Sequence, residues 1–198
     1  MRKTLLFSIG LIMAGMLQAQ IQKGDVQLIG SVSYLNVDNN GNGRSSFSIT
    51  PQAGLFLSDK TAIGLSLGIN SSATDVINNG NGETVELNSN LFVFGAFARF
   101  HKSVADNFYL FLEPSIAFGT GKEDQFNAGE ADRNTFTAGV RPGLLYFLTP
   151  KFAMDMRLGG LLYNRQKTEF GGVETETDIF NFNLDFSSVG FGISYFIR

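Results

Sequence analysis

Five charged side chains lie at matching places in four neighbouring apolar segments of this 198-residue chain. They are Arg99, Glu113, Arg141, Asp155 and Arg157. Each segment alternates apolar residues with small or polar ones, and the charges belong to the second set. Side chains alternate between the two faces of a β-strand, so all five should project from the face opposite the apolar one. Buried charges must be paired, or each costs several kcal/mol. The spacing therefore predicts a group of ion pairs inside a narrow β structure.

Such a group could support three kinds of chemistry. Paired charges would fill a narrow interior and close it, and this is the interpretation that we favour. A water-filled path along the same charges would instead form a pore for small solutes or ions. Acid–base catalysis is the third alternative, but the spacing of the charges indicates no catalytic residue.

A repeated polar motif raises the question of a metal site. Asn-Asn-Gly-Asn-Gly occurs at residues 39–43 and again at 78–82. With Asp38 in front, the first copy imitates the opening of a calcium-binding loop, which requires a bidentate Glu at its twelfth position. Ile49 occupies that position, and Ile77 replaces the leading Asp in the second copy. Because Asn-Gly pairs favour turns, we expect loop tips here, with no metal and no cofactor.

The composition excludes several classes of protein. The chain has no Cys and no Trp, 20 Phe and 23 Gly, and a formal net charge of −3. Without Cys there can be no disulfide, thiol nucleophile or thiolate metal site. The acidic balance is unlike that of a nucleic-acid-binding protein.

The N-terminus predicts an exported protein. Arg2 and Lys3 precede an apolar run over residues 5–17, and residues 17–19 (Leu-Gln-Ala) offer a cleavage site. This pattern is typical of a secretory signal peptide. The run is too short for a transmembrane helix, which needs about 20 residues. We therefore divide the chain into a signal peptide, 1–19, and one domain, 20–198.

Eight alternating segments follow in this domain. Their connections are alternately long and short, with long ones predicted at 38–45, 73–84, 122–133 and 167–178. An apolar face opposite a mixed one, with this rhythm of connections, is typical of an antiparallel barrel whose outside faces lipid. The predicted fold is all-β, an eight-stranded antiparallel up-and-down transmembrane β-barrel. The expected strands are 26–37, 47–57, 62–72, 90–100, 108–119, 136–146, 152–162 and 179–198.

Two details depart from a regular strand pattern. Apolar residues of the eighth segment change parity between Phe186 and Val189, which predicts either a bulge near 187–188 or an upper part that projects beyond the membrane. Three prolines, at 51, 114 and 142, lie inside predicted strands. Because proline cannot donate to the ladder, we expect them at bulges or rims.

The C-terminus completes a resemblance to a known family. Gly192, Tyr195 and Ile197 match the pattern Gly-x-x-aromatic-x-hydrophobic that ends many small outer-membrane barrels, and Arg198 follows it. With the signal peptide and the eight segments, the chain resembles the OmpA/OmpX-like outer-membrane β-barrel family in its Bacteroidetes form. The resemblance implies residence in a Gram-negative outer membrane, contact with lipid and lipopolysaccharide, and assembly by periplasmic chaperones and the barrel-assembly machinery. It places the short turns in the periplasm and the four long loops outside.

The resemblance also frames the predicted function. We expect a non-catalytic protein with a structural role in membrane integrity, or one that contacts an unidentified partner through its four extracellular loops. A narrow pore is one alternative. Another is a lipid A-modifying barrel enzyme, since such barrels use a His with a Ser; however, His101 falls in a predicted periplasmic turn (101–107), away from the outer leaflet. The last is a soluble, lipocalin-like ligand-binding barrel.

Overall fold

The computed structural model describes residues 20–39, 42–77, 84–126, 128–183 and 190–198. The predicted signal peptide and the position predicted for a bulge near 187–188 lie outside these residues. In the described part, no helix is long and apolar enough to cross a membrane. The strands are β1 (Val26–Asn39), β2 (Asn42–Ser58), β3 (Thr61–Ile77), β4 (Thr84–Ala105), β5 (Phe108–Gln125), β6 (Gly129–Phe147), β7 (Phe152–Arg157), β8 (Gly160–Phe170), β9 (Val173–Asn183) and β10 (Gly190–Ile197).

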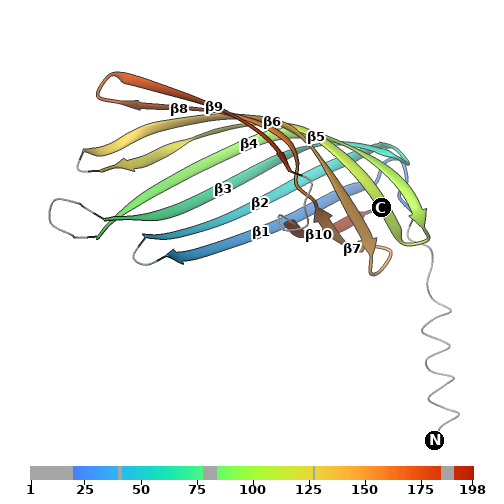
Figure 1. The fold of residues 1–198 in the computed structure, drawn as a ribbon. Coiled ribbons are helices and arrows are strands. Elements are labelled where there is room, and N and C mark those ends of the chain that lie inside the picture. Colours follow the sequence, from blue (N-terminus) through green and yellow to red (C-terminus); the bar gives the residue numbers. More distant parts are fainter. Residues whose placement is uncertain (1–19, 40–41, 78–83, 127, 184–189) are drawn as a thin grey trace, which may run out of the picture.

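The strands form a closed antiparallel ring at the end of the molecule that carries both described chain ends (Figure 1). Neighbours in the chain pair from β1 to β6, β6 pairs with β7, and β7 pairs with β10. The ring closes where β10 pairs with β1, from Val26↔Ile197 to Ser31↔Gly192. β7 and β8 are the two parts of the seventh predicted strand, and β9 and β10 are those of the eighth. The predicted eight-stranded antiparallel barrel is therefore confirmed. We call its closed end the periplasmic end and the other the extracellular end.

The seventh strand is interrupted at Leu158 and Gly159, a feature that the sequence pattern did not predict. Below the break Met156 pairs with Leu144, and above it Leu161 pairs with Val140. The outward-facing residues of this strand are therefore even-numbered below the break and odd-numbered above it. An unbroken alternation over the predicted strand 152–162 would place Leu162 outward with Met154 and Met156, and this is wrong because Leu161 takes that place.

The predicted long loops are mostly strand. Each connection at the extracellular end is a hairpin whose strands stay paired almost to the tip, as in Asn39↔Asn42, Gln125↔Gly129 and Phe170↔Val173. Polar residues occupy both faces of these extensions, so they lack the apolar alternation by which a strand is recognised. Main-chain pairing continues because it requires no apolar face. The boundaries predicted for the four loops are therefore wrong.

The three prolines are accommodated by local gaps in the ladders. Pro51 and Pro114 lie in regular register with one neighbour, at Gly30↔Pro51 and Pro114↔Val140. On the other side each lies in a short gap in the pairing without a change of register. They are mid-strand residues, so the prediction of bulges or rims is wrong for both. Pro142 lies beside the break in the seventh strand, and its carbonyl accepts a hydrogen bond from the Leu158 N–H.

The outside of the wall is apolar and uncovered. Leu65 and Ile193 project outward with 68% and 62% of their surface exposed, whereas the inward Leu145 is fully buried. A soluble barrel exposes polar side chains and hides apolar ones. An exposed band of Leu, Ile and Phe around the barrel is what a lipid environment stabilises.

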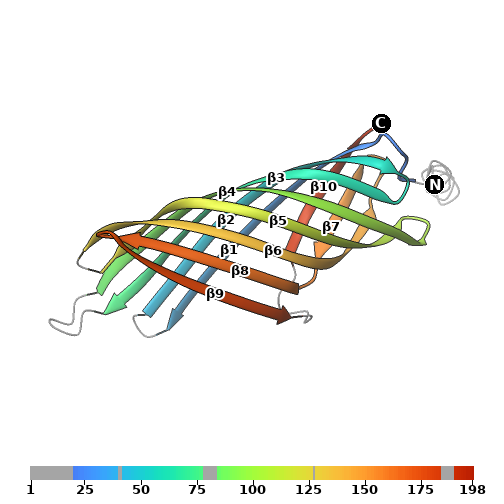
Figure 2. The same cartoon turned by 90° about the horizontal axis from the view of Figure 1, so that it is seen from above.

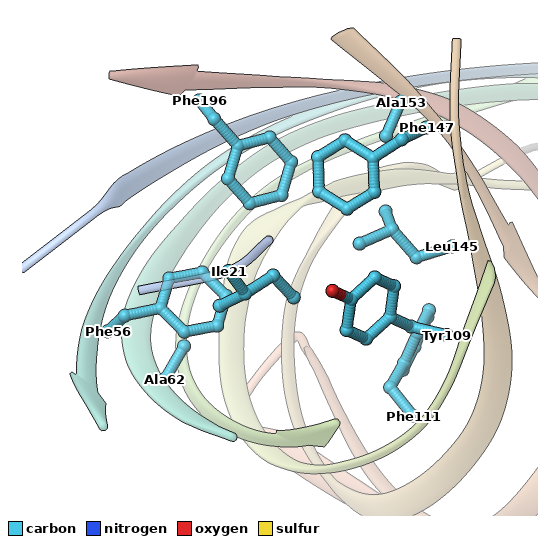
Figure 3. Close-up of a cluster of buried hydrophobic side chains, with 9 residues drawn as sticks. All are labelled: Ile21, Phe56, Ala62, Tyr109, Phe111, Leu145, Phe147, Ala153 and Phe196. Carbon is cyan, nitrogen blue, oxygen red and sulfur yellow. The ribbon is translucent and has the colours of Figure 1, made fainter. Parts of the chain in front are cut away.

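An apolar cluster fills the periplasmic end of the barrel (Figure 3). Ile21, from the segment before β1, projects among aromatic side chains of the facing strands. This segment is held by main-chain bonds between Gly24 and Phe56 and between Phe56 and Asp25. The cluster forms a floor beneath the lumen. Its members are Ile21, Phe56, Ala62, Tyr109, Phe111, Leu145, Phe147, Ala153 and Phe196.

Candidate functional site: the charged lumen

Arg99 is the centre of the predicted charge group. It projects inward from β4, and no part of it is exposed. Its Nε donates to Glu113 Oε2 on β5 at 2.9 Å, and its Nη2 donates to the same oxygen. Its Nη1 donates to Asp155 Oδ2 on β7 at 2.6 Å. The guanidinium carbon also lies 4.1 Å from the ring centre of Phe111, in the floor below. One cation thus bridges two buried carboxylates, an arrangement that compensates part of their desolvation.

Arg157 extends the group toward the extracellular end. Its Nε lies 3.4 Å from Glu113 Oε1, and its Nη2 lies 3.6 Å from Asp155 Oδ1. The same Nη2 donates to the side-chain oxygen of Gln52 on β2. These contacts join β7 to β5 and to β2 across the lumen.

Three uncharged residues complete the network, and the sequence analysis did not select them. Ser194 on β10 donates to Asp155 Oδ2 at 3.3 Å and accepts a bond from Gln27 on β1 at 2.9 Å. Gln52 is the third. All three belong to the inward parity of their strands, which could have identified them as lumen residues. Their type alone gave no reason to choose them over the other inward Ser, Thr and Gln residues.

Arg141 lies in the lumen but outside the ion pairs. It is the register partner of Glu113 across β5 and β6, and it is half-buried. Among the described residues, its guanidinium forms no ion pair or hydrogen bond. The predicted group therefore contains three arginines and two carboxylates, and Arg141 carries the uncompensated charge.

His101 is inside the barrel and not in a turn, so its predicted location is wrong. β4 continues through it to Ala105, and its side chain is buried below Arg99. The imidazole lies between the rings of Phe56 and Phe111, with centroids at 5.1 and 5.8 Å. Neither ring nitrogen has a hydrogen-bond partner among the described residues. This is a packing environment, without the acid that would orient a catalytic imidazole.

The extracellular half of the lumen is a polar chamber. A cavity of about 430 Å³ lies above the ion pairs, lined largely by hydroxyl, amide and arginine side chains. Near its upper rim, Arg133 donates to Ser89 at 3.0 Å and to Gln166 at 2.8 Å. The chamber thus has polar walls and a charged base, beneath which lies the apolar floor.

The predicted assembly pattern lies along the closing strand. Gly192, Tyr195 and Ile197 are on β10, and Tyr195 packs on Phe152 of β7 with ring centres 4.9 Å apart. Arg198, the residue after the pattern, places its Nε 3.4 Å from the buried Asp25 carboxylate before β1. It therefore joins the two ends of the described chain.

An antiparallel ring with an apolar exterior and a charged interior defines a small transmembrane β-barrel. The family model described as "Outer membrane protein beta-barrel domain" matches residues 4–195. The chain belongs to this family. Membership and the apolar exterior argue against the lipocalin-like alternative, and the periplasmic and extracellular ends are named after the usual orientation of such barrels.

Solved structures of small barrels are similar to this chain over nearly its whole length. The N-terminal barrel of Pseudomonas aeruginosa OprF is 14% identical, with 89% of this chain and 98% of that chain covered and a TM-score of 0.45. Neisserial surface protein A is 13% identical, with 88% and 97% covered and a TM-score of 0.48. The Yersinia pestis attachment invasion locus protein, Ail, is 12% identical, with 89% and 100% covered and a TM-score of 0.42. No curated protein sequence matches the chain.

Proposed function

We propose that this outer-membrane protein is non-catalytic and acts at the cell surface, with the barrel as its anchor and the four extracellular hairpins as its contact surface. The closed periplasmic half of the lumen is the observation that carries this proposal. Arg99, Glu113 and Asp155 are fully buried and ion-paired across the lumen, and the apolar floor lies beneath them. A barrel closed in this way supports contact more readily than passage.

The hairpins have the features of an exposed contact surface. On the β5–β6 hairpin Lys122 pairs with Glu130 at 2.6 Å, and on the β8–β9 hairpin Lys167 pairs with Glu174 at 2.7 Å. The bond to Glu130 raises the pKa of Lys122, so this lysine stays charged. Rows of cations and carboxylates could meet lipopolysaccharide or a charged surface on another cell.

Export and assembly complete the proposal. A signal peptide over residues 1–19 would direct the chain to the periplasm, where chaperones would deliver it to the barrel-assembly machinery. Gly192, Tyr195 and Ile197 would form the assembly pattern on β10. Gel mobility of an outer-membrane fraction before and after boiling tests this part, because a folded barrel shifts on boiling. A protein found soluble in the periplasm, without such a shift, would contradict it.

A shortened hairpin tests the contact surface. Residues 166–177 would be replaced by Asn-Gly, which favours a two-residue hairpin turn and joins the paired positions Arg165 and Asp178. The matched control keeps the hairpin length but replaces Lys167 and Glu174 by Ser. Both would be expressed in a strain that lacks the protein.

The readouts separate contact from membrane integrity. We expect the shortened protein to restore detergent resistance of the envelope but not attachment of cells to surfaces coated with glycans or matrix proteins. Restoration of attachment to the wild-type level would overturn the proposal. A shortened protein that folds but restores neither property would favour the role in membrane integrity.

The narrow pore is the second candidate, because a polar chamber lies above the ion pairs. Single-channel recordings in planar bilayers would compare the wild type with Glu113→Ala, which removes one of the carboxylates that Arg99 bridges. We expect no conductance steps from the wild type. Regular steps from it would make transport the leading function.

A further inference from the structure

A short segment before β1 lies across the periplasmic mouth of the barrel and is not part of a strand. We call residues 20–25 the strap. Figure 2 shows the beginning of the described chain and the C-terminus at the same end of the barrel, beside β1 and β10. Gln22, Lys23 and Gly24 are exposed, whereas Ile21 and Asp25 are buried, each with 4% of its surface exposed. The strap therefore has one side in water and two side chains buried in the protein.

Ile21 fills a gap that the strands leave in the floor. The floor residue of β3 is Ala62, whose side chain is a single methyl group, yet Ala62 is fully buried. In Figure 3, the side chains of Ile21 and Phe56 lie beside it. Ala62 is also the register partner of Arg99, the centre of the ion pairs. The strap therefore completes the floor at a position that is level with Arg99 on the neighbouring strand.

His101 lies behind this part of the floor. Its main-chain N–H donates to the Lys60 carbonyl oxygen in the turn before β3, and its ring packs against Phe56. Phe56 is in turn bound to the strap, since its carbonyl oxygen accepts a bond from the Gly24 N–H at 2.8 Å. Its own N–H donates to the Asp25 carbonyl oxygen at 2.9 Å. Release of the strap would therefore free Phe56 and open a path from the periplasm to His101.

The strap is held by local contacts. Asp25 Oδ2 accepts a hydrogen bond from the Gln22 N–H at 3.1 Å, and the same oxygen lies 3.4 Å from Nε of Arg198. Asp59, in the turn between β2 and β3, accepts a bond from the Lys23 N–H at 2.9 Å. These contacts lie outside the ladders that close the ring. Their loss would therefore release the strap while the strands of the ring stay paired.

Two features make the strap separable from the wall. Its turn is formed by Gly24, which has a φ of +94°, and nothing described lies within 4 Å of a Cβ added there. Ile21 is the only apolar residue of the strap, so its opening exposes little apolar surface. Opening is then a local event that costs far less free energy than unfolding of the barrel.

We propose that the strap is a detachable seal of the periplasmic mouth. Ile21 fills the gap at Ala62, and the Asp25 carboxylate holds the strap to Arg198 at the other end of the chain. In the sealed state, water from the periplasm is kept from His101 and from the ion pairs above it. In the open state the strap leaves the mouth, and the lower lumen becomes accessible. This device is separate from the hairpin surface and does not rest on the proposed function.

His101 is a natural probe of the seal, because it is the only histidine of the chain. Diethyl pyrocarbonate transfers a carbethoxy group to a ring nitrogen of an accessible histidine, and mass spectrometry of the peptide quantifies the product. The full mature chain would be refolded into phosphatidylcholine vesicles, and the rate of modification would be measured at pH 7. Boiled protein in denaturant gives the rate for an exposed ring. A shift on boiling confirms that each variant is folded.

We expect the wild type to react about a hundredfold more slowly than the boiled protein, since the reagent must wait for local opening. Ile21→Ala leaves the gap partly empty and should raise the rate about tenfold. Deletion of residues 20–24 should raise it most. Lys23→Ala is the matched control, because this side chain is exposed and only its main-chain N–H holds the strap. Its rate should equal that of the wild type.

The contact between Asp25 and Arg198 is tested by a double-mutant cycle. Asp25→Asn should raise the rate about tenfold, the effect of losing one charge-assisted contact. Arg198→Gln should raise it by a similar factor, and the double variant should react no faster than either single one, because both changes remove the same contact. Independent, multiplying effects would contradict the part of the proposal that assigns the holding of the strap to this pair.

Three results would overturn the seal itself. The first is a wild type that reacts as fast as the boiled protein, since His101 would then be unprotected. The second is a folded deletion variant that reacts as slowly as the wild type, since the strands alone would then close the mouth. The third is an equal increase in Lys23→Ala and Ile21→Ala, which would show that any change in the strap loosens it and that Ile21 does not fill the gap.

Discussion

The two halves of the barrel are built from the same strands but differ in how the wall is closed and in what fills the lumen. In the periplasmic half the ring is closed, Arg99 is fully buried between two carboxylates, and an apolar floor lies below. In the extracellular half, which is open among the described strands, β1 beyond Ser31 and β9 each have one sheet neighbour, the lumen is a polar chamber, and Arg141 is half-buried with no ion-pair partner in the described part of the chain. Arginines of the same predicted group therefore differ in role: Arg99 bridges carboxylates in the closed half, whereas Arg141 lies above those ion pairs.

The boundary between the halves is the break at Leu158 and Gly159. Strand β7 continues the closed ring below it, and β8 begins above it with its faces exchanged. The contrast predicts that equivalent substitutions have larger effects on stability in the periplasmic half. Four predictions test it, in order of decreasing effect.

Arg99→Ala should cause the largest loss, about 3–5 kcal/mol, because it leaves two buried carboxylates, Glu113 and Asp155, with Arg157 as their one remaining ion-pair partner among the described residues. Urea unfolding of the barrel in lipid vesicles, followed by gel mobility, measures it. Adding Glu113→Gln should restore part of the stability by removing one of those charges. A loss no larger than that of Arg165→Ala, an exposed pair on β8, would contradict the prediction.

Leu145→Ala compares the floor with the extracellular half. Leu145 is fully buried in the floor, so its truncation should cost about 2–4 kcal/mol through lost burial and a cavity. Leu162→Ala, whose side chain is half-buried and lines a cavity in the extracellular half, should cost clearly less. The same unfolding assay would show equal losses if the two halves were packed alike.

Gly160→Ala tests the boundary itself. Gly160 has a φ of +146°, and an added Cβ would lie 2.5 Å from the Val140 carbonyl oxygen. Strain and crowding together should cost about 1–3 kcal/mol. Gly30→Ala is the control, because nothing lies within 4 Å of its added Cβ, and its unfolding midpoint should not move. A neutral Gly160→Ala would mean that the break is not held in this conformation.

Lys167→Gln should have the smallest effect. Its partner Glu174 lies 2.7 Å away, but both side chains are about half exposed on the β8–β9 hairpin. Exposed pairs contribute about 0–1 kcal/mol, and salt screens them. The unfolding midpoint in low salt should fall slightly, and the difference from wild type should disappear in 1 M salt. A loss comparable to that of Leu145→Ala would show that the hairpin is part of the stable core.

The closed half was largely predictable from the sequence. The alternation of apolar and polar residues indicated the eight strands. All five predicted charges lie on the face opposite the apolar one, which is the face that lines the lumen. Parity could not tell which charges would pair, because pairing depends on the relative heights of neighbouring strands. Arg99 and Arg141 looked alike in the sequence, yet only Arg99 lies within reach of Asp155.

The open half was predicted less well, for physical reasons. The hairpin extensions are polar on both faces, so no periodicity marks where Ile77 or Phe170 ends its strand. The change of parity in the seventh strand occurs at Leu158 and Gly159, and it is masked in the sequence because the two adjacent leucines above it, Leu161 and Leu162, satisfy either assignment. His101 was assigned to a turn because Lys102 and Ser103 follow it, although β4 continues to Ala105.

The ion pair between Asp25 and Arg198 has a consequence for the order of the chain. Because β1 pairs with β10, the first and last strands are neighbours like any other two, and the barrel has no intrinsic beginning. A circular permutant could therefore join residues 25 and 198 through a short linker and open the chain at the tip between β8 and β9, where Gly171 and Gly172 form the turn. Such a chain would keep the ion pairs of the lumen, although it would lose Ile21 from the floor, while moving Gly192, Tyr195 and Ile197 away from its end. This permutant would separate two roles of β10. One is to close the wall of the folded barrel, and the other is to present the assembly pattern at the C-terminus for delivery to the membrane.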